Sequence, residues 1–143
     1  MEELYELRAY LEQGKYSQAL VLLGEMEEMS REDKVNKINS FLEILLLHLI
    51  KQHAEKRTTR SWEFSIRHAM RQINRTNKRQ RASGYYLTQV DLSTAIDGIY
   101  EDALDRAALE AFEGHYDPPE LAKMVNEDQI KAEALQLILA AQQ

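Results

Sequence analysis

Residues 35–50 of the chain read VNKINSFLEILLLHLI. The apolar side chains in this run recur at intervals of three and four residues, which is the period of one face of an α-helix. They are Val35, Ile38, Phe41, Leu42, Leu45, Leu46, Leu49 and Ile50. Over residues 44–50 the helix is apolar almost all round, as expected for a helix that other helices surround. The run therefore predicts the central helix of an all-α bundle.

Two shorter helical patterns precede this run. The first, over residues 4–11, is expected to end at Gly14 in the left-handed conformation. The second extends from Tyr16 to about residue 29. Residues 30–33, SRED, resemble a capping box, so we expect a third helix to begin there and to contain the central run.

Three further helical segments are predicted after the central helix. Ser61 can cap a fourth helix, which gives way to a basic loop at residues 75–84. A fifth helix spans roughly residues 93–112. Residues 118–119, both proline, open a short helical turn, and Asn126 can cap a last amphipathic helix that we expect to pack against a second subunit. The fold prediction is all-α, a single bundle of five to six helices with a central apolar third helix.

Composition excludes several classes of site. The 143 residues contain no cysteine, which rules out disulfides, thiolate metal sites and cysteine nucleophiles. The histidines, at positions 48, 53, 68 and 115, are never three or four residues apart, so no helix face presents two imidazole ligands. No Gly-x-Ser-x-Gly context surrounds a serine. We therefore predict no metal, no cofactor and no catalytic residue.

The sequence indicates no targeting segment. The opening MEE lacks the basic and then apolar pattern of a signal peptide. The longest apolar run, residues 44–50, is far shorter than the roughly 20 residues that a membrane span needs. We expect a cytoplasmic protein without a membrane partner.

The formal net charge of −6 conceals a strong segregation. Residues 1–30 carry seven acids and two bases, residues 31–81 thirteen bases and five acids, and residues 82–143 twelve acids and three bases. Arginines recur every four residues in the basic part, which places them along one helix face. They are Arg67, Arg71, Arg75 and Arg79.

Two interpretations of this arginine row stay open. Asp97, Glu101 and Asp105 repeat at the same spacing on the fifth helix, so the two rows could face each other as internal salt bridges. Each exposed pair would contribute only about 0.2–1 kcal/mol. We favour this interpretation over the alternative, in which the basic segment 56–81 binds the phosphates of a nucleic acid.

A second cationic cluster lies at the expected start of the fourth helix. Arg57 and Arg60 stand beside Ser61, where the helix dipole already contributes partial positive charge. An anion should offset this charge. We favour internal carboxylates, from the acidic residues 25–28, over a phosphate bound by Arg57, Arg60 and Ser61.

The middle of the chain resembles a known family. The elements that carry the resemblance are LLHLIK at residues 46–51, Arg57, the RSW run at 60–62 with Ile66 and Arg67, and the acidic and aromatic positions at 25–29 and 100–103. Over residues 3–115 the chain is similar to the bacterial all-helical family catalogued as domain of unknown function twenty-nine. The resemblance implies a helical bundle, brings no established activity, cofactor or catalytic residue, and marks His48, Lys51, Trp62 and Tyr100 as a structural signature. It divides a single helical domain, residues 1–143, into a family-like bundle at 1–116 and a C-terminal amphipathic helical extension at 117–143.

Three functional hypotheses follow. The first is a non-enzymatic protein-interaction module that self-associates, as a dimer, or binds another protein. The second is a nucleic-acid binder that uses residues 56–81. The third is a phosphate- or anion-handling enzyme centred on Arg57, Arg60 and Ser61. We favour the first, because the chain shows no signature of catalytic chemistry.

Overall fold

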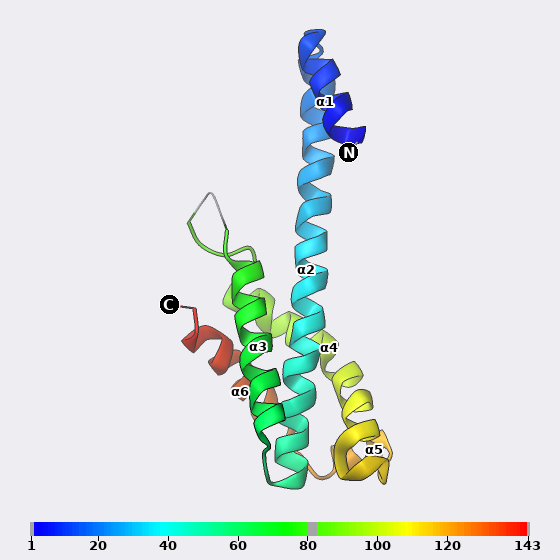
Figure 1. Cartoon of the computed structure of the whole chain (residues 1–143), viewed down its shortest axis with the longest axis vertical. Coiled ribbons are helices and arrows are strands. Elements are labelled where there is room, and N and C mark those ends of the chain that lie inside the picture. Colours follow the sequence, from blue (N-terminus) through cyan, green and yellow to red (C-terminus); the bar gives the residue numbers. More distant parts are fainter. Residues whose placement is uncertain (1, 80–82, 143) are drawn as a thin grey trace. The chain divides into compact units, whose positions relative to one another are not determined.

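The computed structural model describes residues 2–79 and 83–142, and the all-α prediction is confirmed there. The helices are α1 (Glu2–Glu12), α2 (Tyr16–Glu55), α3 (Arg60–Asn77), α4 (Gln89–Glu110), the 3₁₀ helix η1 (Ala111–Gly114), α5 (Pro118–Ala122) and α6 (Glu127–Ala140), as Figure 1 shows. The extended pairing within these residues is one isolated bridge, between Lys78 and Tyr85.

The chain divides into two compact units, residues 1–36 and residues 37–143. We call the described part of the first unit, residues 2–36, the hairpin, and that of the second the bundle. Helix α2 contributes its first half to the hairpin and its second half to the bundle. That the chain forms one single domain stays a prediction.

The predicted helix break at residues 30–33 is wrong. Helix α2 runs without interruption from Tyr16 to Glu55, and Ser30 and Asp33 lie inside it. Serine in a helix interior costs only a fraction of a kcal/mol, about 0.5 relative to alanine. Because no glycine or proline accompanies the capping-box pattern, nothing in this stretch forces the helix to end.

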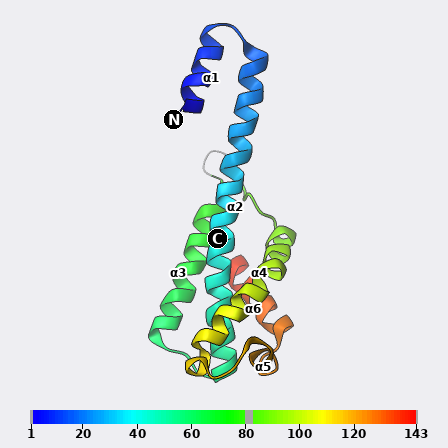
Figure 2. The ribbon, with the colours of Figure 1, turned by 90° about the vertical axis from the view of Figure 1, so that its right-hand side faces the viewer.

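The hairpin consists of α1, a short turn and the first half of α2 (Figure 2). Gly14 adopts the predicted left-handed conformation, with φ of 73°, at the end of α1. The amide of Lys15 donates a hydrogen bond to the carbonyl of Tyr10 across this turn, at 2.8 Å. Among the described residues of the hairpin, Ala19 alone is buried.

The core of the bundle is built around the second half of α2, as the central run predicts. Ile38, Leu42, Leu45, Leu46 and Ile50 are all fully buried. The other helices add fully buried side chains, namely Ile73, Leu92, Ile96, Leu121, Ile130 and Ile138. Each such side chain contributes about 1.5–3 kcal/mol relative to leaving it in water.

Polar caps set the helix boundaries of the bundle. Thr59, and not Ser61, caps α3. Helix α2 ends at Glu55, Lys56 follows it in a left-handed conformation, and the chain is not helical again until after Thr59. Thr88 and Asp91 form a capping box at α4, so this helix begins before the predicted residue 93. The predicted cap of α6 by Asn126 is confirmed. Helix α3 continues through Asn77 and so shortens the predicted basic loop, whose residues 80–82 lie outside the described part of the chain.

Helix α6 packs inside the bundle, against α3 and α4. Its apolar stripe, Ile130, Ala134 and Ile138, is fully buried by the same chain. The stripe is therefore not available to a second subunit, which corrects the expectation that this helix packs against another copy.

None of the helices within residues 2–79 and 83–142 combines the length and the apolar character that a membrane crossing requires. The cytoplasmic location stays a prediction.

Candidate functional site

A cleft of about 600 Å³ opens on the bundle beside Trp62. Its lining residues come from the end of α2, the start of α3 and the junction of α4 with η1. They are Lys51, Glu55, Arg57, Trp62, Glu110, Phe112, Glu113 and His115. Two residues of the structural signature, Lys51 and Trp62, therefore meet Arg57 in this cleft.

Trp62 forms the apolar wall of this cleft and is contacted by two cations. The Nζ atom of Lys51 lies 4.6 Å from the indole ring centroid, and the guanidinium carbon of Arg57 lies 4.7 Å from it. Lys51 is buried, and its ammonium group forms a salt bridge of 2.9 Å with Glu110. A buried ammonium needs such a partner, because an unpaired charge in this environment would cost several kcal/mol. The indole ring and Glu110 thus provide the partners of this buried side chain.

Glu55 links the two sides of the cleft. Its carboxylate accepts a hydrogen bond of 2.9 Å from Nε of Arg57 and one of 3.2 Å from the backbone amide of Phe112. Burial by itself would raise the pKa of Glu55, but the hydrogen bonds from Arg57 and the Phe112 amide outweigh it and hold the pKa below its ordinary value. The ionised carboxylate therefore ties the α2–α3 connection to the end of α4.

The backbone that Glu55 holds is strained. Phe112 and Glu113 adopt φ values of 52° and 57°, and Gly114 continues the left-handed turn at 80°. For residues with a side chain, this conformation costs about 1–2 kcal/mol each. The turn brings Glu113 and His115 to the rim of the cleft.

The predicted anion site is not assembled as a unit. Arg57 is paired with Glu55, while Arg60 and Ser61 are exposed in the first turn of α3. The backbone amide of Trp62 donates a hydrogen bond to the side-chain hydroxyl oxygen of Thr59, at 3.0 Å. The carboxylate that neutralises Arg57 is thus its sequence neighbour Glu55, and not one of the predicted residues 25–28. Anion binding by Arg57, Arg60 and Ser61 stays a prediction.

The other two signature residues, His48 and Tyr100, do not line the cleft. The Nδ1 atom of His48 and the hydroxyl of Tyr100 are buried and find no hydrogen-bond partner within the described residues. His48 and Tyr100 are therefore not hydrogen-bonded to each other through these atoms. Burial, and secondarily the charge of Lys51, lowers the pKa of His48. Burial, and secondarily the carboxylate of Glu127, raises the pKa of Tyr100 to about 12.

The predicted ladder between arginines and carboxylates does not form. Asp97 pairs instead with Lys131 of α6, at 3.1 Å, because α4 packs against α6 and α5. The ion pairs found in the described ranges include none for Arg67, Arg71 or Arg75, all of which are exposed. The row of arginines is real, but its expected internal partners lie elsewhere.

The last arginine of the row belongs to the connection between α3 and α4. The guanidinium of Arg79 lies 5.8 Å from the ring centroid of Tyr86. The hydroxyl of Tyr85 donates a hydrogen bond to the carbonyl of Gln142 at 2.5 Å. The side-chain amide of buried Asn77 meanwhile bonds both the amide and the carbonyl of Leu87. These contacts pin the connection to the bundle, so the two tyrosines serve the fold.

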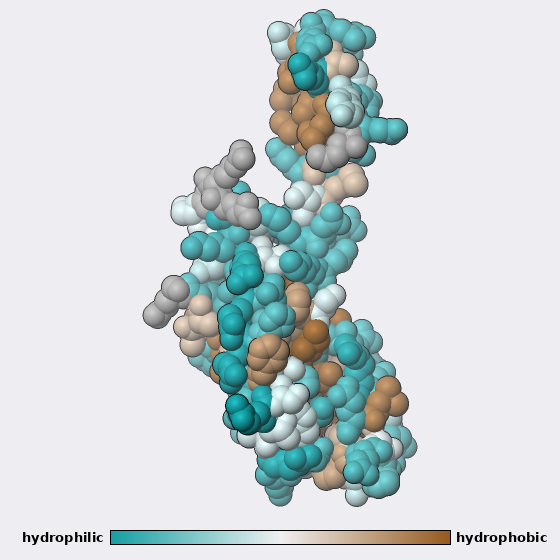
Figure 3. Space-filling view, in the orientation of Figure 1, coloured by the Kyte–Doolittle hydropathy of each residue, from teal (hydrophilic) through white to brown (hydrophobic). Residues whose placement is uncertain are grey.

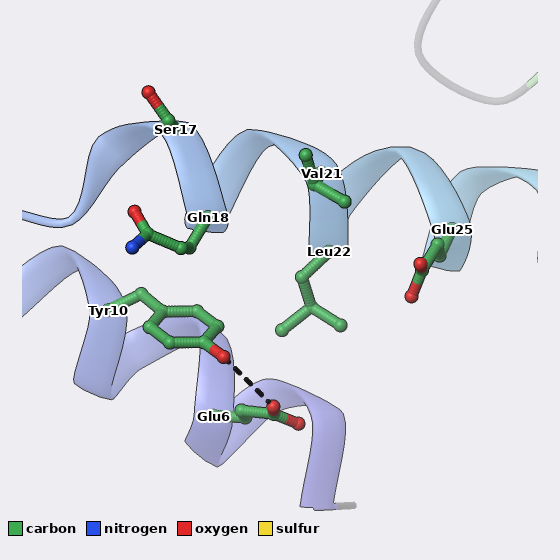
Figure 4. A pocket seen from close by; sticks show the side chains of 7 residues that line it. All are labelled: Glu6, Tyr10, Ser17, Gln18, Val21, Leu22 and Glu25. Atoms are coloured by element: carbon green, nitrogen blue, oxygen red, sulfur yellow. Dashed lines mark hydrogen bonds between the residues drawn. The ribbon is translucent and has the colours of Figure 1, made fainter.

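The hairpin carries a groove of about 350 Å³ between its helices (Figure 4). Tyr10, Val21 and Leu22 give it an apolar floor. The carboxylates of Glu6 and Glu25 line the same groove, and the hydroxyl of Tyr10 donates a hydrogen bond to Glu6 at 3.3 Å. This flank of the hairpin is therefore acidic.

A second surface of the hairpin is apolar, and Figure 3 shows apolar side chains gathered on this unit. Helical spacing places Tyr16, Leu20 and Leu23 on one line along α2, and Leu4 and Leu11 on one line along α1. Their exposed fractions are 64% for Tyr16, 69% for Leu20 and 39% for Leu23. We call these five residues the hairpin apolar surface. The sequence pattern identified them as helix-face residues but gave no signal that they would stay uncovered.

No group of three His, Asp or Glu side chains in the described ranges is close enough to hold a metal ion.

Residues 7–133 match the family described as "Domain of unknown function DUF29". The match extends over most of the chain, which therefore belongs to this family. No curated protein and no solved structure matches the chain. The resemblance inferred from the residues around Trp62 is thus confirmed, while a bacterial origin stays a prediction.

Proposed function

We propose that this DUF29 protein is a non-enzymatic protein-interaction module that self-associates through the hairpin apolar surface. The observation that carries the proposal is the exposure of Leu20 and Tyr16, at 69% and 64%, on a unit that buries only Ala19 among its described residues. Large apolar side chains clustered at a surface are typical of contact sites.

A partner that covers the hairpin apolar surface would stabilise both helices of the hairpin. A helix with an apolar stripe is stabilised by packing that stripe against another element. The hairpin has two helices, and the contact between them leaves Leu4, Leu11 and Leu20 substantially in water. Two hairpins that join their apolar surfaces would form a four-helix arrangement, in which each stripe is covered.

The distribution of charge favours a second copy as the occupant. Arg8 lies beside the apolar line of α1, and Glu27 and Arg31 continue the line of α2, so both signs of charge occur at the rim. The groove carboxylates Glu6 and Glu25 lie on the other flank. A two-fold contact places identical surfaces together, and a rim of mixed charge tolerates this arrangement where an acidic one would not.

The test is the mass of the full chain in solution, measured by light scattering after size exclusion and by sedimentation equilibrium. We expect a dimer at micromolar concentration. The double variant Leu20→Ser/Leu23→Ser should weaken the dimer by about 100-fold or more, because four leucines per dimer lose their contact.

The matched control is Leu109→Ser, which removes a leucine that is 78% exposed on the bundle. This variant should leave the dimer intact. Circular dichroism checks that each variant keeps its helices. A monomeric wild-type chain at all concentrations, or equal weakening by Leu109→Ser, would refute the proposal.

A further inference from the structure

The solvent face of α3 forms a cationic surface that the proposed self-association does not use. Arg60, Arg67, Arg71 and Arg75 project from the side of the helix opposite to buried Trp62, Ile66, Ala69 and Ile73. Four residues advance about 6 Å along a helix axis, so Arg67, Arg71 and Arg75 stand about one turn apart, and Arg60 lies about two turns before Arg67. With Phe64 and His68, which lie among them, these four arginines form what we call the α3 arginine surface.

Carboxylates do not neutralise this surface. Glu63 is the one acidic residue of α3, and it lies toward the edge of the exposed face. None of the ion pairs within residues 2–79 and 83–142 involves Arg60, Arg67, Arg71 or Arg75. Four like charges along 16 residues repel one another, and a bound polyanion would relieve that repulsion.

An ordered aromatic pair lies in the middle of the arginines. The Phe64 and His68 rings are stacked, with centroids 5.8 Å apart and planes at 13°. The ring of Phe41, on α2, contacts His68 edge-on at 5.9 Å and thereby fixes it from the core side. Phe64 nevertheless stays 55% exposed. The pair is thus an aromatic platform that Phe41 contacts on one side and that is open to solvent.

We propose that the α3 arginine surface binds single-stranded nucleic acid, with the arginines on the phosphates and a base stacked on Phe64. Rows of cations combined with exposed aromatic rings are the means by which proteins hold single strands. The faces of duplex bases are stacked on one another, so a duplex offers no free base face to stack on Phe64. An acidic protein surface would satisfy the arginines but would leave the aromatic platform without a role.

The test is fluorescence anisotropy of a labelled oligothymidylate with the full chain, titrated at several salt concentrations. If four arginines each neutralise one phosphate of a single strand, log K should fall with log[salt] at a slope of about −3. Raising the salt fourfold should therefore weaken binding about 50-fold. The unlabelled duplex of the same length should compete poorly.

Two variants separate the contributions of charge and stacking. Arg67→Gln/Arg71→Gln should flatten the salt slope by about 1.4, because two phosphate contacts are lost. Phe64→Ala should weaken binding by about 5- to 150-fold at every salt concentration and leave the slope unchanged, because stacking releases no counterion. Both variants should keep the dimer, so that failure here and failure of the self-association proposal are told apart.

The control Lys15→Gln/Lys123→Gln removes the same charge from exposed positions elsewhere and should leave the salt slope and affinity near those of the wild type. Absence of binding at low salt overturns the inference. Equal affinity for duplex and single strand, or an unaltered affinity in Phe64→Ala, also overturns it, because binding would then be to charge alone. Loss of the dimer in Arg67→Gln/Arg71→Gln would assign the arginines to a protein contact instead.

Discussion

Leu20 and Leu46 lie on the same helix, α2, yet the first is 69% exposed and the second is fully buried. Leu20 belongs to the hairpin and Leu46 to the bundle. In the bundle, side chains of α3, α4 and α6 all contact α2. In the hairpin, α1 is the one other helix. The same residue type therefore supports the fold in one unit and stays largely in water in the other.

The difference separates side chains that stabilise the folded chain from side chains that would gain from being covered. In the bundle, each apolar side chain removed from water adds to the free energy of unfolding. In the hairpin, Tyr16 and Leu20 contribute little until something covers them. Stability measurements on the bundle and association measurements on the hairpin should consequently respond to different substitutions.

The largest expected effect comes from truncating the same residue type in each unit. Leu46→Ala should lower the free energy of unfolding by about 3–5 kcal/mol, since it opens a cavity in a fully buried site. Leu20→Ala should change it by no more than about 0.5 kcal/mol. Urea unfolding followed by circular dichroism, at a protein concentration below that of self-association, measures both. Similar losses in the two variants would show that the hairpin is packed as tightly as the bundle.

A smaller effect comes from one substitution made in two glycine environments. Gly14 has φ of 73° in the hairpin turn, so Gly14→Ala should destabilise the hairpin by about 1 kcal/mol. Gly98 lies inside α4, is exposed, and has nothing within 4 Å of an added Cβ atom. Gly98→Ala should therefore stabilise the bundle by about 0.5–1 kcal/mol.

Amide hydrogen exchange reads the two glycine variants unit by unit. Faster exchange in residues 2–36 alone is expected for Gly14→Ala, and slower exchange in the bundle for Gly98→Ala. Exchange that changes throughout the chain in Gly14→Ala would mean that hairpin and bundle unfold together.

The smallest effect is the dependence of stability on pH. All four histidines lie in the bundle. The pKa of His48 is lowered from 6.5 in the folded state, so the unfolded chain binds more protons as the pH falls below that value. The bundle should lose stability from about pH 7 to about pH 5, whereas the hairpin, without histidine, should not. The lowered pKa of Glu55 extends the loss below pH 4.5.

Thermal unfolding at a series of pH values measures this dependence. His48→Gln keeps a polar side chain of similar size without the titration, so it should flatten the upper part of the profile. If the profile of His48→Gln matches that of the wild type, another group is responsible for the loss.

Periodicity predicts the fold well where burial is complete. The run at residues 35–50 is apolar on nearly every side, and a helix of this kind has few alternatives to the centre of a bundle. The predicted start of a third helix at residues 30–33 was wrong, because a capping-box sequence is also compatible with a helix interior. Whether Ser30 caps a helix or continues one depends on the residues before it, and those residues, EEM, also favour helix.

The candidate site was harder to foresee. Lys51, Arg57 and Trp62 lie within 12 positions of one another, so the short connection between α2 and α3 is enough to bring them together. Glu110 and Phe112 join them from more than 45 positions away, and only the packing of α4 brings them there. The prediction that Asp97 would pair with the arginine row failed for the same reason, because the packing of α4 against α6 decides its partner. A spacing of four residues shows that a row exists, but not which helix faces it.

The single tryptophan of the chain gives the bundle an optical label of its own. Two cations contact the indole ring of Trp62, and the aromatic residues of the hairpin are tyrosines. Indole emission therefore originates entirely in the bundle, at the wall of the cleft. A molecule that enters the cleft and displaces Arg57 would shift this emission. Changes confined to the hairpin would leave the emission unchanged.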